Sequence, residues 1–178
     1  LEEVFGRLTR QFPSRWFVVG TETDDYSALP LIYAKLLEFY ELRPLYEGER
    51  ILYTENFRQL DDSPAELEER ISDVTDALKK GYGGKASKAY QDFLSALYGK
   101  SGRCVQYAWA ALSNAVSKLY FDCFPEEADS VASHQAVQDA LRFSPEALGG
   151  GLEAVFLKIA DHVHQEKASR KGSALDQV

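Results

Sequence analysis

The sequence predicts a mainly α-helical protein, a multi-helix bundle around a central helix at about residues 103–123. Two further segments, at about 62–81 and 85–98, also have apolar side chains at helical spacing, and they end at Gly81 and Gly99. The central segment carries extra Ala beside its apolar face, and a helix apolar over most of its circumference needs neighbours on more than one side. Its apolar positions, spaced by four and three, are Val105, Trp109, Leu112, Val116, Leu119 and Cys123.

The first 60 residues have a different pattern and are expected to form an α/β-like N-terminal portion. Residues 16–20 and 50–54 are β-prone, and a polar loop and a helix at about 30–42 lie between them. This order is that of a βαβ unit. Two strands make a poor parallel sheet, however, because such sheets are normally covered on both faces. Two alternatives stay open: a small β or βαβ element in residues 16–54, or apolar linkers packed on a helical body.

Capping residues predict where the helix at 62–81 begins. Ser63 suits the N-cap, Pro64 the first helical position, and Glu66 completes a capping box. The acidic side chains of this segment lie off its apolar face and are expected to face solvent.

The C-terminal part is expected to hold two more helices and a loose tail. A weaker apolar stripe predicts a helix at about 125–143, and a stronger one predicts a helix at about 152–166. Residues 167–178 have no apolar pattern and are expected to be loose. The whole chain of 178 residues fits a single domain.

Composition and charge restrict the function. The chain is 45% hydrophobic and 27% charged, as in a soluble globular protein. Its net charge of −8 is spread over both halves, so phosphate neutralisation on nucleic acid is disfavoured. The sequence contains no run of 18 apolar residues, so it predicts no membrane-spanning helix. The chain contains no Met, even at its start, so we expect a processed protein or a piece of a larger protein or complex.

Two glycine-lysine stretches resemble phosphate-binding loops but fail the spacing test. A P-loop needs a Gly five positions before its Gly-Lys-Ser/Thr. Before Gly99-Lys100-Ser101 that position holds Leu94, inside a predicted helix. The other stretch, residues 83–85, is followed by Ala86 rather than Ser or Thr. Both are interpreted as helix ends followed by turns, and no cofactor is expected.

The two cysteines are predicted not to pair. Cys104 and Cys123 lie 19 positions apart on one expected helix, which separates them by roughly 28 Å at 1.5 Å per residue. A disulfide spans less than about 7 Å between Cα atoms. Unpaired thiols fit the cytoplasm or another reducing compartment. Cys123 is interpreted as a core residue, and Cys104, beside Arg103 at a helix start, as a candidate reactive thiol.

The histidines predict neither a metal site nor a known nuclease motif. His162 and His164 point about 200° apart on a helix, so they cannot share a metal. A small helical domain with a long central helix resembles the HEPN superfamily in architecture. Its members cleave RNA with an Arg separated from a His by four to six residues. No His of this chain has an Arg at that spacing; Lys158, before His164, comes nearest.

Two features remain as candidate binding surfaces. The acidic loop from Thr21 to Asp25 follows a β-prone run, where α/β proteins often carry function, although such residues also cap helices. Tyr26, Tyr33 and Tyr40 recur every seven residues, and Tyr is enriched at protein contact surfaces. Ordinary half-buried packing is the alternative for these tyrosines.

The sequence therefore favours a non-catalytic protein-interaction or regulatory module with a protein partner. The candidate partner-binding residues are Tyr26, Tyr33 and Tyr40. The alternative is an enzyme or small-ligand binder, for example a helical ribonuclease of unrecognised type, with a site near the acidic loop and the Tyr-rich helix.

Overall fold

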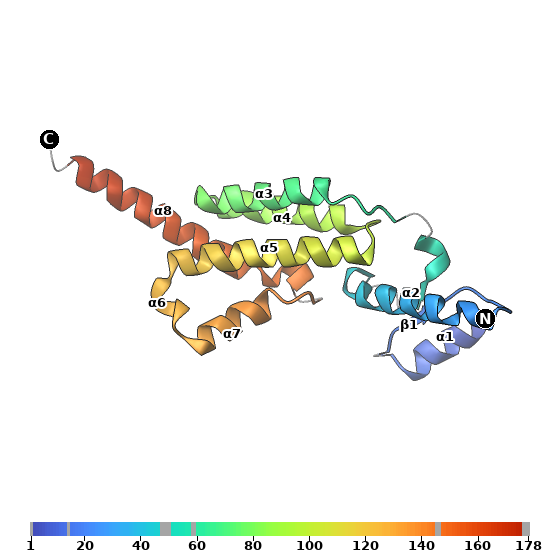
Figure 1. The fold of residues 1–178 in the computed structure, drawn as a ribbon. Helices are drawn as coiled ribbons and strands as arrows, with labels where there is room; N and C mark the ends of the chain where they lie inside the picture. The colour runs from blue at the N-terminus through green and yellow to red at the C-terminus, as the bar shows by residue number, and fades with distance from the viewer. Residues whose placement is uncertain (1, 14, 47–50, 58–59, 145–146, 176–178) are drawn as a thin grey trace. The chain divides into compact units, whose positions relative to one another are not determined.

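A computed structural model (Figure 1) gives the fold of the chain as two compact units. Unit 1 comprises residues 1–62 and 99–105, and unit 2 comprises residues 63–98 and 106–178. Each unit is described by itself, and the single domain expected from the chain length stays a prediction. The structure describes residues 2–13, 15–46, 51–57, 60–144 and 147–175.

Unit 1 contains a small βαβ element, which answers the question left open by the sequence. Strands β1 and β2 pair in parallel, with Phe17 opposite Ile51 and Val19 opposite Tyr53. The elements of this unit are α1 (Glu2–Gln11), β1 (Phe17–Val19), η1 (Tyr26–Ala28), α2 (Leu29–Glu41), η2 (Arg43–Tyr46), β2 (Ile51–Tyr53) and η3 (Thr54–Phe57).

Helix α1 packs against β1, and helix α2 packs against Gly20, the residue just after β1. The ring of Phe5, on α1, lies 6.2 Å from that of Phe17. A Cβ atom on Gly20, just after β1, would lie 3.2 Å from Ile32 and 3.3 Å from Leu36, both on α2. Helix α2 therefore turns its Ile32 and Leu36 side toward the end of β1.

Unit 2 is the predicted bundle of helices. Its elements are α3 (Ala65–Lys79), α4 (Gly83–Leu97), α5 (Gly102–Cys123, whose first residues belong to unit 1), α6 (Pro125–Ala128), α7 (Val131–Ala140), η4 (Ala147–Gly151) and α8 (Glu153–Leu175). Figure 1 shows α3 and α4 side by side with α5 running along them. The prediction of a mainly helical bundle around residues 103–123 is confirmed.

The centre of unit 2 is a cluster of aromatic rings around α5. The Trp109 ring lies 6.4 Å from Tyr90, 6.3 Å from Phe93 and 5.0 Å from Phe143. The Tyr90 ring meets that of Phe156, on α8, edge to face at 5.3 Å. Trp109 and Ser113 also donate hydrogen bonds to the carbonyl of Leu141. These contacts hold α4, α5, α8 and the end of α7 around one core.

Three sequence-based boundaries need correction. Helix α3 begins at Ala65 with Pro64 at the N-cap, one position later than the expected cap at Ser63. The helix expected at 125–143 is two helices, because the chain breaks at Asp129–Ser130 and the Ser130 side chain caps α7.

The third correction concerns the C-terminal tail. Helix α8 continues to Leu175, so residues 167–175, expected to be loose, are helical; residues 176–178 lie outside the described residues. In this part of α8 the described side chains, of residues 167–169, are exposed, and polar bonds support the helix there. Ser169 donates to the carbonyl of Gln165, and Lys167 Nζ donates to the carbonyl of Lys79 at the end of α3. Across the described residues, none of the helices is long and apolar enough to cross a membrane.

Candidate functional site

The turn from Gly99 to Gly102, the strongest phosphate-loop resemblance in the sequence, is filled by the chain's own carboxylates. Lys100 Nζ lies 2.6 Å from Asp61 Oδ2, and its side chain is only 7% exposed. The Ser101 hydroxyl donates to the Asp62 carboxylate and accepts the N–H of Cys104. All of these residues belong to unit 1.

The first backbone N–H of α5 is also occupied. Gly102 N–H donates to Glu38 Oε1 at 3.0 Å, and backbone bonds join Asp61 to Gly99 and Ser101. Gly99 has a positive φ of 80°, which lets the chain turn sharply after α4. Side-chain anions thus occupy positions where a phosphate-binding loop would hold phosphate. These bonds tie the 99–102 turn to Glu38, Asp61 and Asp62 within unit 1.

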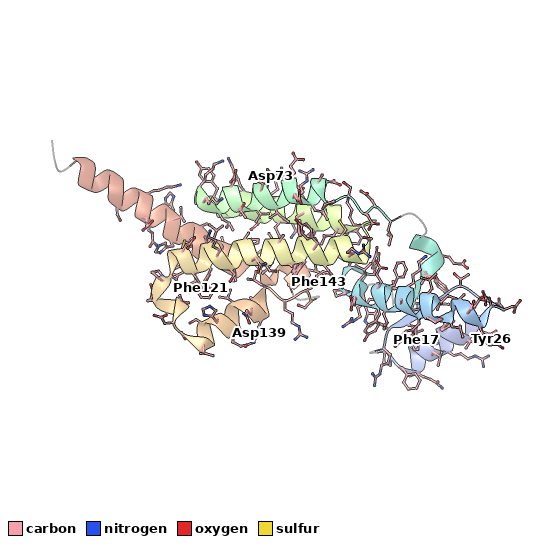
Figure 2. The ribbon with its side chains drawn as sticks, viewed as in Figure 1. Phe17, Tyr26, Asp73, Phe121, Asp139 and Phe143 are labelled. Atoms are coloured by element: carbon pink, nitrogen blue, oxygen red, sulfur yellow. The ribbon has the colours of Figure 1, made fainter. Side chains whose placement is uncertain are left out.

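The predicted tyrosine residues lie together on the exposed side of unit 1. Tyr26, just before α2, is 85% exposed, Tyr33 is 63% exposed and Tyr40 is 44% exposed. Figure 2 labels Tyr26 among the side chains of this unit. Leu29 and Leu37 are exposed between them, at the helical spacing that places them on the same side of α2. We call Tyr26, Leu29, Tyr33, Leu37 and Tyr40 the tyrosine face.

Helix α2 is therefore apolar on two sides. Ile32 and Leu36 face the end of β1, and Phe39 is buried, whereas the tyrosine face lies in solvent. Among the described residues no hydrogen bond satisfies the hydroxyls of Tyr26, Tyr33 or Tyr40. The alternative of half-buried packing fits Tyr40 best, because the Arg43 guanidinium lies 4.2 Å from its ring centre.

Side chains of the acidic loop form hydrogen bonds within the loop and to Ser27 just after it. Asp25 accepts hydrogen bonds from the backbone N–H and the hydroxyl of Ser27, which lowers the pKa of its carboxyl and caps η1. Thr23 in turn accepts the N–H of Asp25. The capping interpretation of this loop accounts for these contacts. Among the described residues, no three Asp, Glu, His or Cys side chains are arranged to hold a metal.

Both cysteines lie on α5 and both are free, as predicted. Cys104 is 5% exposed. Burial raises the pKa of the Cys123 thiol, and the carboxylates of Glu166 and Asp122 raise it further. The reactive-thiol hypothesis for Cys104 stays a prediction, and the thiol has little access to solvent.

The end of α5 carries a polar cluster that the sequence did not predict. Lys158 Nζ, on α8, lies 2.8 Å from Glu127 Oε1 and 2.5 Å from the hydroxyl of Tyr120, which donates to Glu127 Oε2 at 2.6 Å. Lys158 Nζ also lies 4.5 Å from the centre of the Phe124 ring. Lys158 is the cation whose distance in sequence from a His, His164, comes nearest to that of the ribonuclease motif. It is therefore bound within this cluster.

The histidines lie apart from one another. The His134 ring stacks on that of Phe121, with 4.2 Å between centres, and the His162 ring lies 4.8 Å from that of Phe124. His164 is exposed on α8. The structure therefore gives His134 and His162 packing contacts on the last turn of α5 and the residue after it.

A second feature that the sequence analysis missed is an open groove of about 510 Å³ in unit 2, between α3 and α4. Lys80, Tyr82, Lys85 and Lys88 line it around the α3–α4 turn. Residues 77–91 hold four Lys and no Asp or Glu. Charge counted over such a short window, rather than over half of the chain, would have found these lysines, and Asp73, Asp76 and Asp92 line the same groove.

Comparisons of the chain with protein-family models, with curated proteins and with solved structures found no match in any of the three. The fold and the surfaces define a mainly helical protein with a small parallel βαβ element and an exposed aromatic helix side.

Proposed function

We propose that the chain is a protein-interaction module that binds a partner protein through the tyrosine face of α2. This proposal is supported by the exposure of five large side chains along one side of α2 and the turn before it, next to the side of α2 that packs in unit 1. Large apolar side chains gathered in solvent are typical of contact surfaces. Tyr is favoured there because it adds a hydrogen-bonding hydroxyl to a large apolar ring.

The catalytic alternative has less support. In the acidic loop, Thr23 accepts the N–H of Asp25, and Asp25 accepts the N–H of Ser27. The lysine of the 99–102 turn is bound to Asp61, and Lys158 is bound to Glu127. Catalysis needs groups that can reach a reacting atom, and these groups hold the fold instead.

Site-specific photo-crosslinking tests the proposal. A photoreactive residue at position 37, at the middle of the tyrosine face, should capture a partner protein in the cells that naturally make this chain. The same residue in place of Asn114, an exposed position of unit 2, is the matched control and should not capture that partner.

A second variant makes the test specific to the aromatic side chains. Tyr33→Ser combined with Tyr40→Ser should abolish the crosslink from position 37 and leave the circular dichroism spectrum unchanged, because both side chains are exposed. Equal capture at positions 37 and 114, or an undiminished crosslink in the double variant, would contradict the proposal.

A further inference from the structure

The groove between α3 and α4 gathers lysines from both helices around one aromatic ring. Lys80 ends α3, Lys85 and Lys88 lie on the first turns of α4, and Tyr82 lies between the two helices. Tyr82 is 49% exposed, and Lys85 Nζ lies 4.8 Å from the centre of its ring. The volume of about 510 Å³ is in the range of small-ligand sites.

The same groove is lined by three carboxylates as well as three lysines, and two of these carboxylates already have another cation nearby. Asp73, labelled in Figure 2, has Arg70 at 3.8 Å, and Asp76 has Lys79 at 4.0 Å. Asp92 is the third carboxylate of the lining. In the described part of the chain, Lys80, Lys85 and Lys88 make no ion pair. Three unpaired ammonium groups therefore face one unpaired carboxylate.

One further lysine lies near the end of α3. Lys79, which already pairs with Asp76, continues the basic run in the sequence, and Lys167, on α8, donates to the carbonyl of Lys79 at 3.1 Å. Since the chain as a whole has a net charge of −8, this gathering of bases runs against its overall composition.

Gly83 has a packing reason, whereas Lys80 and Lys88 make no ion pair in the described part of the chain and Lys85 contacts the Tyr82 ring. A Cβ atom on Gly83 would lie 3.0 Å from Leu157 and 3.4 Å from Ala160, so Gly83 allows α4 to start close to α8. The first backbone bonds at this end run from the N–H groups of Lys85 and Ala86 to the carbonyl of Tyr82, and no side chain caps the helix. The N–H groups of Gly83 and Gly84 come before these bonds and add to the positive end of the groove.

We propose that this groove binds a small anion with adjacent phosphate groups, held by Lys80, Lys85 and Lys88. Lysines contact phosphate through charge-assisted hydrogen bonds. Two sources share this chemistry: an inorganic polyphosphate, or a nucleoside di- or triphosphate whose base stacks on Tyr82. The site lies in unit 2 and is independent of the tyrosine face.

Titration of the ¹⁵N-labelled full chain with pyrophosphate, and separately with ATP, tests the proposal. At about 150 mM salt, screening leaves little diffuse attraction, so binding reports the site. Saturable shifts are expected for the amides of Gly83 and Gly84. Absence of saturation by both probes at about 10 mM would overturn the proposal, because it limits any affinity to the weak millimolar range.

Matched lysine variants separate the site from general charge. Lys80→Gln with Lys85→Gln should raise the dissociation constant at least about tenfold, because two charge-assisted contacts are lost. Lys35→Gln with Lys118→Gln changes the net charge equally, from −8 to −10, at exposed positions elsewhere and should leave the constant within about twofold. Equal weakening by both pairs would overturn the proposal.

Tyr82→Leu then distinguishes the two sources of phosphate. Loss of ATP affinity with unchanged pyrophosphate affinity would identify a nucleotide, because only the base needs the ring. Equal affinity of the variant and the parent for both probes would identify the polyphosphate alone.

Discussion

Lys100 Nζ lies 2.6 Å from a carboxylate oxygen of Asp61, a residue 39 positions earlier in the chain. The lysine is 7% exposed, whereas the Asp61 side chain is 54% exposed. A parallel backbone bridge joins the same two residues. The lysine of a phosphate-loop-like stretch therefore pairs with a half-exposed carboxylate of the same chain and ties the turn before α5 to the segment before α3.

Removing the carboxylate should cost more than removing the lysine. Asp61→Asn removes the carboxylate that lies 2.6 Å from the buried Lys100 ammonium and should lower the free energy of unfolding by about 1–3 kcal/mol, less than for a fully buried pair because Asp61 is half exposed. Lys100→Met removes the charge itself and should cost less. Urea unfolding followed by circular dichroism measures both. Asp24→Asn, at an exposed position of the same unit, is the control, and an equal effect there would contradict the prediction.

Glycine at the start of α5 is required by the close approach of Glu38. A Cβ atom at Gly102 would lie 2.5 Å from Glu38 Cγ, so Gly102→Ala must displace the carboxylate that accepts the Gly102 N–H. We expect a loss of about 1–2 kcal/mol, from the cost of a capping bond. Gly84→Ala, near the start of α4, meets nothing within 4 Å and should be neutral or stabilising by up to about 1 kcal/mol.

Urea midpoints of the two glycine variants provide the measurement. The prediction depends on their difference, because both changes add the same methyl group within the first turn of a helix. It would be wrong if Gly102→Ala were as stable as Gly84→Ala.

The helices could be predicted because their burial pattern is local. The seam of α5 places Val105, Leu112 and Val116 fully inside, as the spacing of four and three requires. The continuation of α8 beyond Glu166 could not be predicted in this way, because residues 167–169 are exposed and the contact from Lys167 to Lys79 spans 88 positions. Local patterns carry no information about such contacts.

The same limit applies to the sites. Spacing excluded a phosphate loop at 99–102, but Glu38 lies 64 positions from Gly102, and only the fold brings them together. The pairing of β1 with β2 is equally non-local, which is why the βαβ element stayed one of two alternatives. The tyrosine period of seven was readable because it lies within α2 and the turn before it, and exposure then separated its two sides.

The cluster at the end of α5 should make stability depend on pH. Hydrogen bonds from Lys158 and Tyr120 lower the pKa of the Glu127 carboxyl, and those with Glu127 and Tyr120 raise the pKa of Lys158. Glu127 therefore stabilises the fold above its unfolded-state pKa, and this contribution is lost as pH falls through its folded pKa. The contribution of Lys158 is present below its unfolded-state pKa and is lost as pH rises through its folded pKa. The cluster should contribute fully between about pH 5 and pH 10.

Glu127→Gln should reduce the free energy of unfolding by about 0.2–1 kcal/mol at neutral pH, as for a partly exposed pair, and by less at about pH 3. Urea unfolding at both pH values measures the difference. Glu126→Gln, at the exposed neighbouring position, should change the free energy of unfolding by the same amount at both pH values. A Glu127→Gln effect that stays constant from neutral pH to about pH 3 would exclude this role for the cluster.

Thiol labelling decides the role of Cys104. Its side chain is 5% exposed, and burial together with Glu166 and Asp122 disfavours the thiolate of Cys123. Both thiols should therefore react with a disulfide reagent at least about tenfold more slowly in the native protein than in urea, where both become accessible. The reaction in urea should release two equivalents without prior reduction, because both cysteines are free. One fast equivalent in the native protein, lost in Cys104→Ala but kept in Cys123→Ala, would instead show that Cys104 is the reactive thiol suggested by its place at the start of α5.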